Sequence, residues 1–360
     1  MKAIADEMWG NCDGQTATEH RYGAGRIHWG GSLAASIAAP PDFISNDPNL
    51  NFVHRRDGDI EIYFLSNEGK KEILAECTFR ISGLIPELWY PDSGKRVRPA
   101  KYSISAGQIS LPIHFDSSGS VFVLFRRIAN PADPIAFIDE PQKAPDREPV
   151  RSMPALLPLF VDGTVQMSVS HPGEYVLKLR SGKTVETTAG EIPNPLELTG
   201  AWQLRFPPDL GAPSTATFER LASWTASKHD GIRYFSGTAT YQKSFVVTAA
   251  QKKSDIQLYL DLGTVKNLCE VSLNGQNLGI VWKPPFRLDV TSAARIGTNQ
   301  LEVRVTNLWP NRLIGDLRNP QLKPITWTTF NPYEADSPLL ESGLLGPVTV
   351  TASRVIRFAP

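Results

Sequence analysis

Alternation of apolar and polar residues is the feature that most constrains how this chain folds. In residues 299–305, NQLEVRV, the apolar Leu301, Val303 and Val305 alternate with polar or charged residues, as in a strand with one buried face. Similar segments recur along the chain between clusters of Gly, Pro, Asn and Asp, with no helical period between them. We therefore predict a mostly β protein built from antiparallel sheets.

The first half of the chain predicts a β-sandwich. Strand patterns occupy residues 59–67, 73–81, 86–91, 101–115 and 120–127. Short strands at this spacing favour two packed antiparallel sheets. We place this antiparallel β-sandwich at residues 49–130.

The second half predicts another β domain. Residues 174–190 read as a hairpin that turns at Ser181 and Gly182, and residues 255–263 alternate strictly. A sandwich of the jelly-roll, galactose-binding-like type would accommodate this many strands. We place this domain at residues 156–360.

Two segments fall outside these domains. Residues 1–48 resemble a short α/β remnant, because residues 25–30 read as a short buried strand and residues 32–39 as a helix that two prolines end. Residues 131–155 are rich in proline and charge, which predicts an extended linker.

The composition excludes several classes of partner. The 37 basic and 37 acidic side chains cancel, so no overall field favours nucleic acid or an anionic membrane, and we expect a neutral partner. Cys12, Cys77 and Cys269 lie too far apart in sequence for a C-x-x-C zinc site or a disulfide framework, and Cys269 reads as a buried thiol. The start of the chain lacks the features of a signal peptide, which predicts a cytoplasmic protein, or a secreted or periplasmic one if the chain is a fragment.

One hairpin allows a geometric prediction. Asn274 and Gly275 form a two-residue turn between apolar-alternating arms, which would place Glu270 opposite Gly279 and Ile280 on the core face. The glycine would leave space above the Glu270 carboxylate. A ligand could use that space, and a solvated glutamate is the alternative interpretation.

Aromatic and polar side chains gather after two strands. Two prolines hold Trp282 and Lys283 on a stiff edge, and residues 308–316, LWPNRLIGD, interrupt the alternation. Indole rings stack on sugars, while amide and guanidinium groups bind hydroxyls. The predicted carbohydrate-binding residues are Trp282, Lys283, Trp309, Asn311, Arg312 and Trp327. The alternatives are that Trp282 belongs to the core and that Arg312 and Asp316 form only a surface ion pair.

Candidate catalytic residues are carboxylates. Glycoside hydrolysis normally uses two carboxyl groups, about 5 to 5.5 Å apart for retention and about 6.5 to 9.5 Å apart for inversion. The available carboxylates include Glu270, Asp289, Asp316, Glu334, Asp336 and Glu341, and the sequence alone leaves open which of them converge. If the chain is catalytic by itself, we predict that the pair comes from Glu270, Asp316 and Glu334. No cofactor or metal is required, although Asp316 could serve as an oxygen ligand for calcium. The motifs of serine hydrolases, zincins, P-loop proteins and Rossmann enzymes do not occur.

Several longer stretches carry a family resemblance. They are residues 21–30, 54–67, 86–95, 197–206, 233–245, 260–291, 297–316 and 342–350. Together they resemble the C-terminal region of the α-L-rhamnosidase-type glycoside hydrolases of family 106. Residues 270–305 also resemble the sugar-binding jelly roll of family 2 enzymes such as β-galactosidases and β-glucuronidases.

The resemblance implies a carbohydrate-active protein. It suggests a glycoside hydrolase acting on a terminal neutral sugar of the rhamnoside or β-galactoside type, while the catalytic barrel of the family would precede Met1. The alternative is a non-catalytic fragment that binds carbohydrate or supports a larger glycosidase. The implied partners are a saccharide or glycoside, and either a barrel domain or a second copy of the chain.

Overall fold

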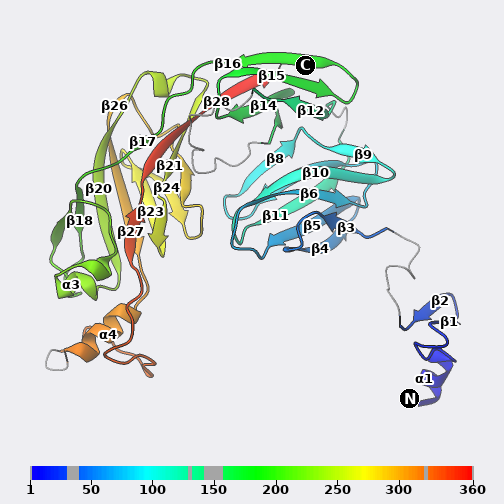
Figure 1. Ribbon diagram of the computed structural model, residues 1–360, viewed down its shortest axis with the longest axis horizontal. Coiled ribbons are helices and arrows are strands. Elements are labelled where there is room, and N and C mark those ends of the chain that lie inside the picture. The colour runs from blue at the N-terminus through cyan, green and yellow to red at the C-terminus, as the bar shows by residue number, and fades with distance from the viewer. Residues whose placement is uncertain (1, 31–39, 129–131, 142–156, 320–322, 359–360) are drawn as a thin grey trace.

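The protein is mostly β, as the alternation predicts. The computed structural model describes residues 2–30, 40–128, 132–141, 157–319 and 323–358. Strands make up 49% of it and helices 8%, which confirms the predicted fold class of packed β-sandwiches (Figure 1). No described helix is long and apolar enough to cross a membrane.

The N-terminal residues form a small unit of one helix and one hairpin. Its elements are α1 (Lys2–Trp9), β1 (Glu19–Tyr22) and β2 (Gly25–His28). Strand β2 pairs with β1 and is at most half-buried, so the expectation of a buried strand here is wrong. The helix predicted at residues 32–39 lies outside the described residues. Helix α1 was not predicted, and it buries none of its residues.

The first sandwich packs two antiparallel layers. One layer contains β3 (Phe43–Ser45), β6 (Ile73–Phe79), β9 (Ser103–Ser105) and β10 (Gln108–Phe115). The other contains β4 (Leu50–Asp57), β5 (Ile60–Asn67), β7 (Ile85–Tyr90), β8 (Lys95–Pro99) and β11 (Ser120–Arg126). Alternate residues of β5, β6 and β10 are buried between the layers, as a period of two requires.

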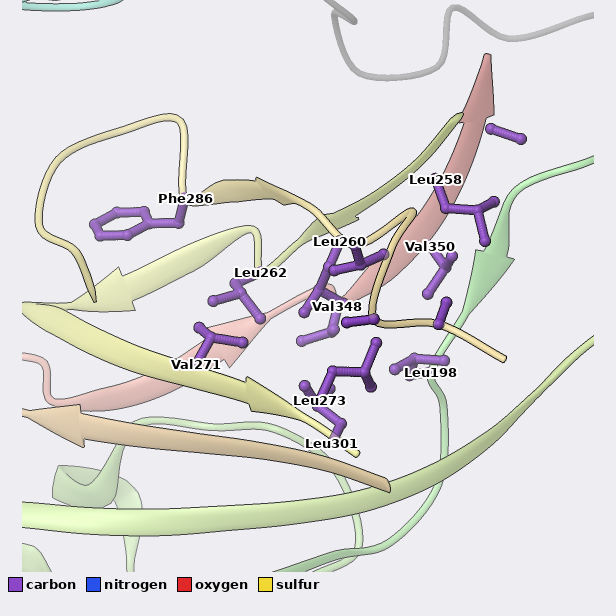
Figure 2. Packing of buried hydrophobic residues seen from close by; sticks show 14 of the residues in the cluster. Leu198, Leu258, Leu260, Leu262, Val271, Leu273, Phe286, Leu301, Val348 and Val350 are labelled. Carbon is purple, nitrogen blue, oxygen red and sulfur yellow. The ribbon is translucent and has the colours of Figure 1, made fainter. Parts of the chain in front are cut away.

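The second β unit is larger. One layer contains β13 (Leu159–Val161), β14 (Thr164–Val169), β17 (Leu196–Glu197), β21 (Ile256–Asp261), β25 (Arg287–Asp289) and β28 (Thr349–Phe358). The facing layer contains β18 (Trp202–Arg205), β19 (Thr215–Phe218), β20 (Thr238–Val247), β23 (Leu268–Leu273), β24 (Gln276–Val281) and β26 (Gly297–Thr306). Figure 2 shows part of the core between them, including Leu258, Val271 and Leu301.

Shorter elements complete this unit. They are β12 (Ile135–Asp139), β15 (Gly173–Leu179), β16 (Thr184–Ala189), β22 (Thr264–Lys266) and β27 (Gly343–Gly346), the single turns η1 (Trp224–Ala226) and η2 (Ala250–Lys252), and the helices α3 (Asp230–Arg233) and α4 (Pro310–Arg318). Strand β12 falls inside the range predicted as a linker, yet it pairs with β15 and contributes Ile135 to the core of this unit. Residues 142–155 of that range lie outside the described residues.

The two sandwiches share one sheet. Strand β8 of the first pairs with β13 of the second, so that a single sheet of eleven strands runs through both units. This junction fixes which loops of the two units face one another.

The hairpin at Asn274 has a different register from the one predicted. The two-residue turn is present, but a bulge follows it, so Val271 pairs with Gly279 and Glu270 pairs with Ile280. Gly279 has φ +103°, a conformation that other residues rarely adopt and that allows the extra residue. The expectation that Glu270 faces a glycine is therefore wrong. Ile280 is 61% exposed and does not lie on the core face.

Candidate functional site

A cavity of about 690 Å³ lies between the two sandwiches. Its walls come from the β7–β8 turn and the end of β10 on one side, and from β24, β25 and the loop between them on the other. The volume falls in the usual range of small-ligand sites, about 300 to 1,000 Å³. We call this cavity the inter-sandwich cleft.

Lys283 occupies the centre of the polar part of this cleft. Its Nζ lies 3.0 Å from Asp92 Oδ2 and 3.0 Å from Asp116 Oδ2, and both carboxylates belong to the first sandwich. The side chain of Lys283 is 16% exposed. Burial disfavours the ammonium, but the hydrogen bonds and charges of the two carboxylates outweigh it and raise the pKa of Lys283. The lysine is therefore a fixed cation.

The local sequence holds Lys283 in place. Pro284 and Pro285 follow it and cannot continue a strand ladder. The next residue, Phe286, is 6% exposed and belongs to the core of the second sandwich (Figure 2). The loop is anchored immediately beyond the lysine, which fixes where the ammonium can reach.

Two further titratable groups line the cleft in neutral form. Burial, followed by the charges of Asp116 and Asp92, raises the pKa of Tyr90 to about 12. Burial also lowers the pKa of His114, while the nearby carboxylates of Asp116 and Glu72 oppose this and Arg287 adds to it. Both rings offer uncharged hydrogen-bonding groups at neutral pH.

The charges that line the cleft balance. The cations are Lys95, Lys283 and Arg287, and the anions are Asp92, Asp116 and Asp289. The cleft therefore has no net charge that would select an ionic ligand.

An exposed aromatic ring stands beside these polar groups. Trp282 lines the cleft and is 60% exposed, so the interpretation of this ring as a core residue is not supported. Ile280, also at the cleft, extends the apolar surface. The cleft thus combines one open indole with a limited set of hydrogen-bonding groups. Of the predicted residues, Trp282 and Lys283 are the two that the structure brings together here.

The residues predicted on segment 308–316 mainly fasten a loop. Asn311 is 1% exposed and exchanges hydrogen bonds with the backbone of Leu340 at 2.7 and 2.8 Å. Arg312 is 7% exposed and pairs with Asp316 at 2.9 Å. Asp316 also accepts hydrogen bonds from Ile325 and Thr326. As they are placed, Asn311 and Arg312 could meet a sugar only if this loop moved.

Three other predicted residues are exposed near that loop. Trp309 immediately precedes α4 and is 54% exposed, and Trp327 is 79% exposed. Glu334 is exposed, and its backbone N–H donates to Ser337. None of the three lines the inter-sandwich cleft.

Glu270 lies on the outer face of the second sandwich. Its carboxylate accepts a hydrogen bond from Asn277 at 2.6 Å and forms an ion pair with Arg304. Both carboxylate oxygens therefore have partners, which fits the interpretation of Glu270 as a surface residue.

Sequence reasoning missed Asp92 and Asp116. Each follows a predicted strand and precedes a serine, so both fall among the Gly, Pro, Asn and Asp clusters that separate the predicted strands. One sequence feature could have indicated these residues: both turns follow strands of the same sandwich, and each contains an aspartate. Their common partner, Lys283, is more than 160 residues away in the chain, as the separation of 167 from Asp116 shows.

No metal site is evident in the part of the chain that the structure describes. No group of three or more His, Cys, Asp or Glu is placed there to hold an ion. Asp316, named from the sequence as an oxygen ligand that could serve calcium, is used by Arg312 and by the loop at Ile325 and Thr326.

Comparison with known proteins supports the family resemblance. Residues 1–104 match the α-L-rhamnosidase family. The solved structure of a rhamnosidase from Novosphingobium sp. PP1Y aligns with 98% of this chain at 34% identity and a TM-score of 0.70. The chain resembles rhamnosidases of this family, as the sequence predicts.

A second relative points to the same broad class. A putative β-glucuronidase of Formosa agariphila is 41% identical over 56% of this chain. The chain spans 28% of the rhamnosidase and 19% of the putative β-glucuronidase. Both comparisons indicate a protein related to glycoside hydrolases.

Proposed function

We propose that this chain binds a terminal neutral sugar for a glycoside hydrolase, with α-L-rhamnosides as the first substrate class. The sugar would occupy the inter-sandwich cleft, stacked on Trp282 and bonded to the groups around Lys283. In this proposal the described residues bind the saccharide and do not provide the catalytic carboxylate pair.

The balanced charge of the cleft is the observation that carries the proposal. Lys283 is already shared by two carboxylates, so its ammonium offers no uncompensated charge to a uronate. Neutral hydroxyls can still donate to Asp92 and Asp116 and accept from the lysine. An exposed indole beside such groups suits the apolar face and the polar edge of a pyranose.

The contacts of the predicted catalytic carboxylates support a binding role for the chain. Both oxygens of Glu270 have side-chain partners, and Asp316 is held by Arg312 and by a loop. A general acid or nucleophile needs an oxygen that faces the substrate. Glu334 is exposed, but it does not line the cleft.

Calorimetry and hydrolysis assays on the purified chain test this proposal together. We expect binding of methyl α-L-rhamnoside, no measurable binding of D-glucuronate, and no turnover of aryl α-L-rhamnoside, β-D-galactoside or β-D-glucuronide. Turnover that disappears in two folded variants among Glu270→Gln, Asp316→Asn and Glu334→Gln would instead make the chain a glycosidase with those carboxylates. Absence of binding to every neutral glycoside would reject the sugar-binding role.

A further inference from the structure

The two sandwiches are connected on both sides of the cleft. On one side, β8 and β13 form a seam in which Phe160 pairs with Arg98 and the Ala100 N–H donates to the Pro158 carbonyl at 2.8 Å. Phe160 packs against the cores of both sandwiches. This seam is short, so side-chain contacts elsewhere must help to set the angle between the units.

The triad of Lys283, Asp92 and Asp116 forms the second connection. Lys283 comes from the second sandwich, three residues before the core residue Phe286. Asp116 comes from the first sandwich and directly follows Phe115, which is 2% exposed. The triad therefore joins Lys283 and Asp116, two side chains that lie close to different cores, together with Asp92.

The cleft lies between the seam and the triad. Val97 and Leu159 of the seam strands and all three members of the triad line the same cavity. Any rotation about the seam would change the width of the cleft and would have to break the contacts of Lys283.

We infer that Lys283, Asp92 and Asp116 form an electrostatic latch that fixes the angle between the sandwiches and so sets the width of the saccharide cleft. This inference rests on the proposed function for the identity of the ligand. Its structural part does not need the ligand, because the latch acts on the free protein.

The carboxylates of Asp92 and Asp116 determine whether the cleft opens or closes when the Lys283 charge is lost. Asp92 and Asp116 share one ammonium, and their side chains are only 29% and 28% exposed. Without the lysine charge they would repel each other and draw water into the cleft. Loss of Lys283 therefore opens the cleft, and a ligand would then bind only through the remaining closed population.

Pulsed electron paramagnetic resonance measures this opening directly. Spin labels at Lys70→Cys and Ser254→Cys would report one exposed position in each sandwich, and the native Cys12, Cys77 and Cys269 are buried. We expect a longer and broader distance distribution in Lys283→Met. In the double variant Asp92→Asn and Asp116→Asn we expect a broader distribution, because both ion pairs are lost without leaving two carboxylates to repel each other. A wild-type distribution in a folded Lys283→Met protein would overturn the latch.

A matched variant controls for loss of charge in the cleft. Lys95 lines the same cavity, but it is exposed and makes no ion pair with a described residue. Lys95→Met should keep the wild-type distribution. If Lys95→Met opened the cleft as much as Lys283→Met, general charge would control the width and the latch would be rejected.

Ligand binding separates failure of the latch from failure of the proposed function. If the latch acts, methyl α-L-rhamnoside should bind Lys283→Arg much like the wild type and Lys283→Met about tenfold more weakly, as expected when about a tenth of the molecules remain closed. Opening in Lys283→Met without any binding by the wild type would support the latch and reject the saccharide. Binding of the glycoside by the wild type, with no change of the distance distribution in Lys283→Met, would support the saccharide and reject the latch.

Discussion

Lys283 and Trp282 are neighbours in the sequence but have opposite environments. The lysine side chain is 16% exposed and held by two carboxylates, whereas the tryptophan is 60% exposed. The first supplies fixed polar geometry, and the second supplies an apolar surface that a ligand can cover. Together they give the cleft its mixed character.

Replacement of Trp282 tests the contribution of stacking. In Trp282→Ala the ring surface at the cleft is lost without disturbing a core, so we expect about tenfold weaker binding of methyl α-L-rhamnoside, equivalent to about 1.4 kcal/mol. Thermal stability should stay within experimental error. Calorimetry on Trp327→Ala, which removes a more exposed ring away from the cleft, should show wild-type affinity.

His114 makes the first sandwich sensitive to acid. Burial lowers its pKa in the fold, while the unfolded histidine titrates near 6.5. Between these two values the unfolded chain binds more protons, so the free energy of unfolding falls as the pH drops below about 6.5. Above about pH 6.5 the histidine is neutral in both states, so His114 no longer lowers the free energy of unfolding.

Urea unfolding across this pH range checks the assignment. The loss of stability between about pH 7.5 and about pH 5 should be smaller in His114→Gln than in the wild type, because the glutamine cannot take up a proton. Equal pH dependence in the two proteins would show that other groups account for the acid sensitivity.

Among the elements, the β23–β24 hairpin shows how one extra residue shifts the pairing register of a strand. The bulge at Gly279 moves Ile280 opposite Glu270 and brings the exposed Trp282 to the cleft. Gly279 has open space around it, so an added methyl group would meet no neighbour. Its requirement for glycine arises from φ alone.

Substitution of Gly279 therefore tests the energetic cost of its positive φ alone, because an added methyl group would not clash with a neighbour. We expect Gly279→Ala to destabilise the protein by about 1 to 3 kcal/mol. Gly190→Ala is a suitable comparison, since its new methyl group would make ordinary contacts with Arg354 and its φ lies outside the left-handed region. Chemical denaturation showing equal stability of the two variants would contradict the strain at Gly279.

Helix α4 serves as an anchor for the loop that follows it. Asn311 bonds both the N–H and the carbonyl of Leu340, so Asn311→Ala should remove two hydrogen bonds that hold the loop and cost about 1 to 3 kcal/mol. Trp309→Ala, on the exposed start of the helix, should change stability much less. Denaturation curves that rank these two variants in the opposite order would argue against the anchoring role.

The sequence predicts strands well and chemistry less well. Alternation alone located β5, β6, β10 and β26, because each buries one face and period two follows directly from that. Residues 308–316 were interpreted as a binding loop, although they contain two signals of a helix. These are a proline at the start of α4 and the four-residue spacing of Arg312 and Asp316.

Only some of the residues that line the cleft could be predicted from the sequence. Trp282 and Lys283 stood out because two prolines follow them, but Asp92 and Asp116 looked like ordinary turn residues. Their meeting with Lys283 depends on the β8–β13 seam, which joins distant parts of the chain. A single sequence has no local pattern that reports such a long-range contact.

At the scale of the whole molecule, a shared sheet, a cleft and an ionic triad form one arrangement. The shared sheet holds the sandwiches side by side (Figure 1). The ion pairs of Lys283 with Asp92 and Asp116 link the two units at the cleft. We propose that a neutral sugar binds in this cleft.

Fluorine NMR of the protein labelled with fluorotryptophan tests that claim most directly. The chain has eight tryptophans, and the Trp282 signal can be assigned with Trp282→Phe. Titration with methyl α-L-rhamnoside should shift the Trp282 signal and leave those of the exposed Trp309 and Trp327 unchanged. A shift confined to Trp309 or Trp327 would place the sugar at helix α4, and a spectrum without any shift would contradict sugar binding by this chain.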